Sequence, residues 1–126
     1  MVRKDDWMFN INQVLLCGYV ASEVELRYTK TQKPVLTFRM ATNEYINNQN
    51  VVYYHNIVLW NDAEDYAALM KGDYVTVLGK LRYRKWQDKQ GQDRYTTEIL
   101  AVTMTVGLKK ETSNFNDFSQ EENIPF

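Results

Sequence analysis

The chain has 126 residues, 44% of them hydrophobic and 25% charged, which suits one globular domain with a core but hardly two. Its longest apolar run, Val14–Cys17, is too short to cross a membrane, and no apolar segment of a secretory signal follows the charged N-terminus. The single cysteine excludes an intrachain disulfide, and with His55 as the only histidine the chain offers no zinc cluster. We therefore expect a cytoplasmic protein that needs no metal or other cofactor and contacts no membrane.

The net charge of −1 hides an uneven distribution. Residues 111–126 contain four acids and no bases, whereas residues 1–110 contain 15 bases and 12 acids and carry a net charge of +3. Nine tyrosines and three tryptophans bring the aromatic content to 13%, and several of these rings stand beside bases. A mildly basic, aromatic body favours stacking on nucleobases, although tyrosine-rich strands are also common in small β-proteins.

The body of the chain is predicted to consist of strands, because short apolar or alternating segments are separated by polar turns. The five predicted strands cover residues 12–20, 35–43, 51–60, 74–86 and 94–106. Gly18 in the first strand indicates a bend or bulge, and Cys17 beside it is interpreted as a small core residue. In the second strand Leu36, Phe38 and Met40 recur at every other position and form its apolar face.

One short helix is predicted between the third and fourth strands. Asn61 or Asp62 can cap its start, and Gly72 is expected to end it in a left-handed conformation. Three residues at helical spacing form its apolar face: Tyr66, Leu69 and Met70. The polar loop 46–50 joins the second and third predicted strands, and the polar loop 88–93 joins the fourth and fifth. The order of three strands, a helix and two strands is that of an OB-fold, an all-β, five-stranded Greek-key barrel, although other small barrels fit the pattern about equally well.

The fourth strand separates two kinds of side chain, because successive residues point to opposite faces. Its polar face carries three cations and a tryptophan: Lys80, Arg82, Arg84 and Trp86. Its other face carries the residues interpreted as core: Val75, Val77, Leu81 and Tyr83. Cations contact phosphates and a flat ring stacks on a base, so the polar face favours nucleic-acid binding. A solvated barrel face explains the charges equally well, although an exposed tryptophan without a use is costly.

In the third strand Tyr54 and Trp60 share one face with Asn56 and Val58, at a spacing that suits successive stacking platforms. Two interpretations stay open, because both rings could equally belong to the core. His55 points to the opposite face and is interpreted as a packing or interface residue, since much of its ring is apolar.

The sequence carries no strong signature of an enzyme. It has no phosphate-binding GxxxxGK loop, no GxSxG nucleophile elbow and no Cys–His motif. The acids Asp62, Glu64 and Asp65 stand at the predicted helix start, where capping explains them. Asp88 and Asp93 flank a loop that could hold a metal ion, which keeps a metal-dependent nuclease as a distant alternative. We predict that the chain is not an enzyme.

The last segment differs from the body in composition. Residues 109–126 are rich in Asn, Ser, Asp and Glu and lack periodicity, so we expect a disordered tail after a folded domain of residues 1–108. The tail nevertheless ends in three apolar residues, Ile124, Pro125 and Phe126, for which a solvated segment has no internal reason. A protein-interaction module that acts mainly through this tip is therefore a second candidate function.

With these features the chain resembles the bacterial single-stranded DNA-binding proteins. The similarity runs from about residue 12 to residue 106 and is sharpest in the Lys-Gly of 71–72, the Val-Leu-Gly-Lys-Leu-Arg of 77–82, the Arg-Lys-Trp of 84–86 and the Gly-Gln-Asp-Arg-Tyr-Thr-Thr-Glu of 91–98. Earlier matches are the Asn-Gln-Val of 12–14, Gly18, the Glu-Leu-Arg-Tyr of 25–28, the Ala-Thr-Asn-Glu of 41–44 and the His-Asn-Ile-Val-Leu-Trp of 55–60. The last six residues, Glu-Glu-Asn-Ile-Pro-Phe, are similar to the family's acidic tip.

The resemblance implies an OB-fold, usually a homotetramer, that binds single-stranded DNA with little sequence preference in the cytoplasm, at the nucleoid. By resemblance, Tyr54, Trp60 and Trp86 fall at aromatic stacking positions, and His55 falls at a subunit-interface position. The expected DNA-contacting residues are Arg27, Tyr28, Arg39, Tyr54, Trp60, Lys80, Arg82, Arg84, Trp86 and Arg94. The tip would recruit replication, recombination and repair proteins through Glu121, Glu122, Ile124, Pro125 and Phe126.

The chain also departs from the family pattern. Ile46 stands at another aromatic position of the family, and alternation points the neighbouring Tyr45 the other way. The tail lacks the usual Gly/Gln/Pro-rich linker, and its tip has two glutamates and an asparagine in place of an aspartate run. The lead-in, residues 1–9, is longer than is typical and contains Trp7, to which no role is assigned. A secondary, phage or mobile-element paralog fits this trimmed form.

Overall fold

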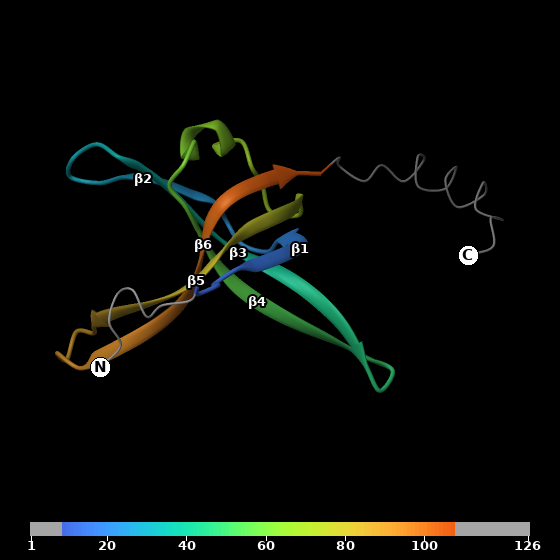
Figure 1. Ribbon diagram of the computed structural model, residues 1–126. Helices are drawn as coiled ribbons and strands as arrows, with labels where there is room; N and C mark the ends of the chain where they lie inside the picture. The colour runs from blue at the N-terminus through green and yellow to red at the C-terminus, as the bar shows by residue number, and fades with distance from the viewer. Residues whose placement is uncertain (1–8, 108–126) are drawn as a thin grey trace.

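The computed structural model describes residues 9–107, and these form a single sheet that closes on itself (Figure 1). Its strands are β1 (Val14–Val20), β2 (Glu25–Tyr28), β3 (Pro34–Ile46), β4 (Gln49–Leu59), β5 (Tyr74–Gln87) and β6 (Asp93–Val106). Their order is β1-β5-β6-β4-β3-β2, and a further pairing of β1 with β3 closes the barrel. Trp7 and the predicted tail with its tip lie outside the described residues.

β1 and β2 act as one bent strand. β1 pairs with β5 and reaches β3 through Tyr19 and Val20, and β2 continues along β3 after the break at residues 21–24. The six segments therefore make five barrel strands, and the predicted all-β OB-fold is confirmed. All five predicted strands are present, and only the four-residue β2 lies outside the predicted ranges.

Gly18 lies where β1 passes close to β3. A Cβ atom at this position would collide with the carbonyl oxygen of Ala41, so only glycine allows the two backbones to approach. Of the bend or bulge expected at Gly18, the bulge is absent, because the pairing of β1 with β5 is regular there. The register shift falls instead between Leu78 and Gly79, in the pairing of β5 with β6.

Alternating residues of the strands fill the barrel. The predicted apolar face of β3 is confirmed, because Leu36, Phe38 and Met40 are buried. The rest of the core comes from the other strands and the connection after β4: Val20, Ile57, Leu59, Ala63, Leu69, Val75, Val77, Ile99, Ala101 and Met104. Each fully buried large side chain stabilises the fold by roughly 1.5–3 kcal/mol relative to exposure.

Two residues expected in the core are exposed. Cys17 points away from the barrel interior, and its Sγ lies 3.3 Å from the Oγ1 of Thr76 on β5. Tyr83 is 69% exposed, although it shares the face of Val77 and Leu81. Beyond Leu81, β5 leaves the barrel, and no part of residues 9–107 covers the Tyr83 ring. Alternation identified the face correctly, but the barrel does not extend far enough to cover it.

The predicted helix is much shorter than expected. It consists of one 3₁₀ segment, η2 (Ala63–Tyr66), and Asp62 before it has a left-handed backbone and no capping side-chain hydrogen bond. Leu69 is buried, but Met70 is exposed, so the predicted apolar face does not form as a unit. Gly72 does adopt the expected positive φ, of 97°. No helix formed by residues 9–107 is long and apolar enough to span a membrane.

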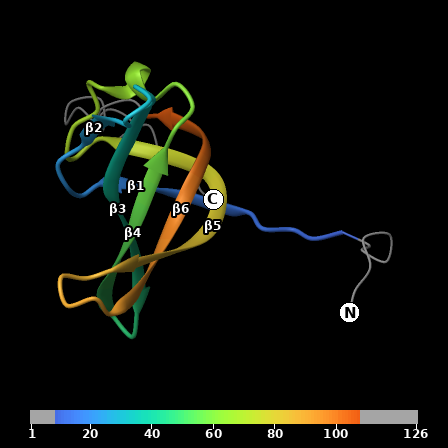
Figure 2. The ribbon, with the colours of Figure 1, turned by 90° about the vertical axis from the view of Figure 1, so that its left-hand side faces the viewer.

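Two hairpins extend beyond the closed part of the barrel. β4 and β6 pair in parallel only between Ile57–Leu59 and Ile99–Ala101, and past this contact they diverge. The result is a β3–β4 arm (residues 41–54) and a β5–β6 arm (residues 82–98), which separate in the lower half of Figure 1 and lie on the same side of the barrel in Figure 2. The turn of the first arm is tight, because Asn47 and Asn48 both have positive φ angles.

Candidate nucleic-acid interface

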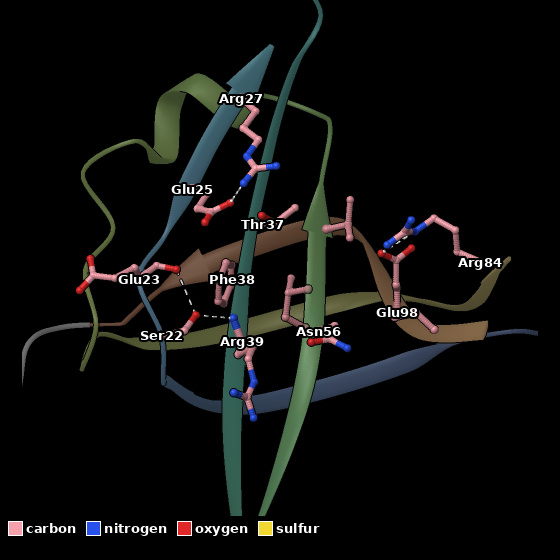
Figure 3. Close-up of a pocket in the computed structure, with 13 residues that line it drawn as sticks. Ser22, Glu23, Glu25, Arg27, Thr37, Phe38, Arg39, Asn56, Arg84 and Glu98 are labelled. Carbon is pink, nitrogen blue, oxygen red and sulfur yellow. Dashed lines mark hydrogen bonds and ion pairs between the residues drawn. The ribbon is translucent and has the colours of Figure 1, made fainter. Parts of the chain in front are cut away.

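A groove of about 550 Å³ crosses the outer face of β2, β3, β4, β6 and β5 (Figure 3). Cross-strand pairing places Thr37 beside Val58 and Arg39 beside Asn56. Thr96 and Glu98 continue the same face on β6. Because side chains alternate along a strand, every second residue of these strands points to this side, which we call the groove face.

The groove is lined by both signs of charge. Its arginines are Arg27, Arg39 and Arg84, and its glutamates are Glu23, Glu25 and Glu98. Arg27 pairs with Glu25 at 2.6 Å, and Arg84 pairs with Glu98 at 3.2 Å (Figure 3). Within residues 9–107 no ion pair engages Arg39, so its guanidinium remains available to an anion entering the groove.

Two of the three predicted stacking rings lie on β4 and immediately after it, each beneath a cation. Tyr54 is 57% exposed, and the guanidinium carbon of Arg39 lies 4.6 Å from the centre of its ring. Trp60 is half-buried, with the Nζ of Lys33 5.7 Å from its ring centre. Neither ring belongs to the core, so the core interpretation left open by the sequence is wrong, and stacking on these rings stays a prediction. Both cations favour the negative face of the ring they cover.

The third ring, Trp86, lies on the β5–β6 arm and is held in place. It stands opposite Arg94 in the strand pairing and is 41% exposed. Its indole Nε1–H donates a hydrogen bond of 2.7 Å to the Oγ1 of Thr96 on β6. The bond fixes how the ring lies across the two strands.

The predicted cations of β5 and β6 also lie on the groove face. Arg82 and Arg84 both donate to the carboxylate of Glu98, while Lys80 is exposed at the base of the arm. Arg94 donates from Nε to the Oδ2 of Asp88 at 3.0 Å. Asp88 is in turn held by the backbone N–H groups of its loop, first that of Gln92, which lower its pKa below the ordinary value.

Two predicted residues lie elsewhere. Tyr28 does not share the face of Arg27; its hydroxyl donates to the Oε2 of Glu64 at 2.9 Å, and this hydrogen bond raises the pKa of Tyr28. His55 points away from the groove face, as expected, and its Nε2 lies 2.9 Å from the Oγ1 of Thr42. Partial burial lowers the pKa of His55.

The structure also brings to this face residues that the sequence alone does not indicate as part of the site. Lys33 covers Trp60, Thr96 orients Trp86, and Glu98 holds the two arginines. Tyr45 is 77% exposed and shares the face of Tyr54, since it lies four residues from Ala41, which pairs directly with Tyr54. Side chains alternate along β3, so Tyr45 falls on the same face as Arg39 and on the opposite face from Ile46. Counting from Arg39 would therefore have identified Tyr45 as a residue of the site.

The fold and this face together define a class of protein. The closed barrel carries exposed rings and cations along the strands that OB-folds use for oligonucleotides, so the chain is an OB-fold protein with the surface of a nucleic-acid binder.

Comparison with known proteins identifies the family. The model of the single-strand binding protein family matches residues 11–106, and the chain belongs to this family. Single-stranded DNA-binding protein 1 of Streptococcus pyogenes is 30% identical over 120 residues, which cover 91% of this chain and 92% of that one. Single-stranded DNA-binding protein 1 of Chlorobaculum tepidum is 33% identical over 124 residues, covering 91% and 76%. Among solved structures, the Plasmodium falciparum SSB in complex with ssDNA matches with a TM-score of 0.70 and 28% identity, over 79% of this chain and 97% of that one.

Proposed function

We propose that this protein binds single-stranded DNA without sequence specificity, by stacking bases on Tyr54, Trp60 and Trp86 and by contacting phosphates with the cations around them. The observation that carries the proposal is the groove face itself, which bears the exposed rings of Tyr54 and Trp86, with the half-buried Trp60 just past the end of β4 and basic side chains beside all three. Membership of the single-strand binding protein family supports it.

The rings account for tolerance of sequence. Every base has a π-face, so each stack contributes about 1–3 kcal/mol whatever the base. A duplex should bind poorly, because its bases are already stacked on one another. Stacking and phosphate contacts require no side chain to make or break a covalent bond, and the proposed function is binding without catalysis.

The cations account for attraction to the backbone. We assign phosphate contacts to Arg27, Arg39, Lys80, Arg82, Arg84 and Arg94. Contacts of this kind release counterions, so the affinity should fall as salt rises. Tyr28 is left out of the proposed site, because its hydroxyl is bonded to Glu64 and it lies off the groove face.

The test is a titration with oligo(dT), followed by tryptophan fluorescence. Stacking of a base on Trp60 and Trp86 should quench the signal, and Trp86→Ala should weaken binding roughly 5- to 150-fold, as expected for one lost stack. Tyr83→Ala is the matched control, because Tyr83 is an exposed ring on the opposite face of the same strand and should be dispensable. A wild-type protein that shows neither quenching nor binding at low salt would contradict the proposal.

We also propose that the C-terminal tip recruits replication, recombination and repair proteins. The support is in the sequence: four acids and no bases in residues 111–126, closed by Ile124, Pro125 and Phe126. Deleting the last three residues should abolish capture of such partners and leave the affinity for oligo(dT) unchanged or slightly higher. A large loss of DNA binding on deletion would show that the tip is not a separate recruiting element.

The protein is further proposed to assemble as a homotetramer, with His55 at a subunit interface. An exposed apolar face over β1 and β5 supports self-association, with Leu15 beside Leu78 and Tyr19 beside Tyr74. β1 pairs with β5 along one edge, but within residues 9–107 its other edge has no strand partner over Val14–Gly18. Such an edge can pair with another chain. Light scattering should give the mass of four chains, and Leu15→Lys should reduce it. A monomeric wild-type protein would refute the assembly.

A further inference from the structure

Glu98 is the one buried charged residue of residues 9–107, and it lies on the groove face. It is 6% exposed and stands directly opposite Arg82 in the pairing of β5 with β6. Its Oε1 accepts from the Nη2 of Arg82 at 3.0 Å, and its Oε2 accepts from the Nε of Arg84 at 3.2 Å. Two arginines at successive outward positions of β5 thus converge on one carboxylate.

This arrangement changes the charge that the arm presents. A buried carboxylate is tolerated only when it is paired, and here both partners are on the neighbouring strand. The two guanidinium groups would repel each other if the carboxylate were absent. Together the three side chains carry a net charge of +1, although the sequence shows two adjacent outward arginines.

The two arginines are not equivalent. Arg84 lines the groove, and its side chain is half exposed, whereas Arg82 is more covered and does not line the groove. Arg84 uses Nε for Glu98, and within residues 9–107 its two terminal nitrogens have no hydrogen-bond partner. Those terminal nitrogens offer four further N–H donors to a ligand. Arg82 donates to Glu98 through Nη2 and its Nε is buried without a partner, so fewer of its N–H groups are open to a ligand than those of Arg84.

We propose that Glu98 is a positioning residue of the single-stranded DNA site. It binds Arg82 and Arg84 into one unit of net charge +1 and leaves the terminal nitrogens of Arg84 free to bind a backbone phosphate. The inference rests on the proposed function and deepens it, because it states that the two arginines count as a single phosphate contact.

The proposal has a thermodynamic signature in the salt dependence of binding. For single strands, the logarithm of the affinity falls with the logarithm of the salt concentration with a slope of about −0.7 per neutralised phosphate. Glu98→Gln removes the carboxylate and leaves two independent cations, so the slope should become steeper by about 0.7. At about 1 M salt, where charges are screened beyond a few ångströms, the same variant should bind more weakly than the wild type, because Arg84 is no longer held in place.

The experiment measures the oligo(dT) affinity of the full chain as a function of NaCl concentration for four proteins. They are the wild type, Glu98→Gln, Arg84→Gln with Glu98→Gln, and Asp93→Asn. The double variant restores a net charge of +1 and should recover the wild-type slope. Asp93→Asn makes the same change of charge, but Asp93 pairs with Lys85, which points away from the groove face, so its slope should stay that of the wild type.

The outcomes separate this inference from the proposed function. If Glu98 only stabilised the fold, the single variant would keep the wild-type slope and the double variant would be shallower by about 0.7, and either result overturns the proposal. Circular dichroism checks that each variant is folded. If Glu98→Gln alone is unfolded, the double variant is compared with Arg84→Gln, which differs from it only in keeping the Glu98 carboxylate. The salt slope of the double variant should then be the steeper of the two, and equal slopes overturn the proposal. A wild-type protein that fails to bind oligo(dT) would instead refute the proposed function.

Discussion

At the scale of single residues, the groove face is occupied by the protein's own side chains. Arg39 covers Tyr54 and Lys33 covers Trp60, at the sites where bases are proposed to stack. We expect each cation to move from the ring to a phosphate when a base arrives, because an arginine or lysine side chain is long enough to reach either. The same cation then serves both states, and the ring is never left fully open to water.

Trp86 differs, because a hydrogen bond rather than a cation fixes its ring. Thr96→Val keeps the shape of the side chain but removes the Oγ1 that accepts from the indole N–H. We expect the ring to lose its fixed orientation and the affinity for oligo(dT) to fall roughly 2- to 12-fold, the equivalent of one net hydrogen bond. Fluorescence anisotropy of the tryptophans and an oligo(dT) titration measure the two effects. Thr96→Ser retains the acceptor and should behave like the wild type; equal loss in both variants would rule out the hydrogen bond as the cause.

At the scale of elements, the chain before β1 anchors the arm that carries Trp86. The segment leading into β1 passes β5 and extends away from the barrel (Figure 2). There the side chain of Asn12 takes the place of a neighbouring strand: its Nδ2 donates to the carbonyl oxygen of Leu81 at 2.8 Å, and its Oδ1 accepts from the N–H of Leu81 at 2.9 Å. Leu81 is the last residue before the β5–β6 arm, so this pair of bonds holds the base of the arm.

Asn12→Leu should therefore lower the free energy of unfolding. The change removes both bonds and leaves the backbone groups of Leu81 without these partners, at a cost of about 1–3 kcal/mol, near the lower end because water can reach the site. Urea unfolding measures the loss. Gln13→Leu is the matched control, since it makes a similar change at the next residue, for which the structure gives no side-chain hydrogen bond among residues 9–107. Equal stability of the two variants would show that Asn12 does not hold the arm.

The tip of the β5–β6 arm should respond to pH through Asp88. The lowered pKa of Asp88 means that the folded tip favours the ionised carboxylate. The stability that this carboxylate gives to the tip is complete above the ordinary carboxyl pKa and is lost as the pH falls through the lowered value. We expect the amides of Gln90 and Gln92, which donate to Asp88, to stay protected at neutral pH and to lose protection only in acid. Amide chemical shifts and exchange measured against pH report this. In Asp88→Asn the acid transition should disappear; if it persists, another group is responsible.

Alternation along the strands predicts which face a side chain points to, but not whether that face is covered. Alternation placed Lys80, Arg82, Arg84 and Trp86 on one face, and the structure agrees, because a regular strand keeps its period of two even outside the barrel. Alternation does not tell whether a face is covered, and for this reason Tyr83 and Cys17 were assigned wrongly to the core.

Long-range contacts explain the other differences. The burial of Glu98 depends on the register of β5 against β6, which places it opposite Arg82 and which no local pattern in the sequence reveals. The predicted helix does not form, because the connection between β4 and β5 is tied to distant strands by hydrogen bonds, such as that from the Tyr66 hydroxyl to the carbonyl oxygen of Met104. Local helical spacing cannot outweigh such contacts in a segment of this length.

At the scale of the whole molecule, the two faces of the β3–β4 arm have different proposed tasks. One face carries Tyr54 and Tyr45 toward DNA, and the other carries His55, which is proposed to meet another subunit. Because the two faces belong to the same two strands, assembly would stiffen the arm that holds the stacking rings. Binding and assembly are then linked through one hairpin.

Because of this link, the stability and the assembly of the protein should both depend on pH through His55. Burial lowers the pKa of His55, so the folded protein binds its proton less readily than the unfolded chain, and stability falls as the pH drops below about 6.5. The groups around the ring are the Thr42 hydroxyl on β3 and, across the cleft between the arms, Leu81, Tyr95 and Thr97, none of them an acid that would stabilise the charged ring. If a second subunit buries His55 further, protonation should weaken the assembly as well as the fold.

Light scattering between pH 8 and pH 5 should therefore show the tetramer dissociating on the acid side, within the range where histidine titrates. His55→Gln keeps a hydrogen-bonding group for Thr42 but cannot take up a proton, so its assembly should not respond to pH in this range. His55→Lys places a permanent charge at the same position and should dissociate at every pH. A tetramer that stays intact in the lysine variant would move His55 out of the interface, because a buried, unpaired ammonium group cannot be accommodated between two subunits without a large loss of affinity.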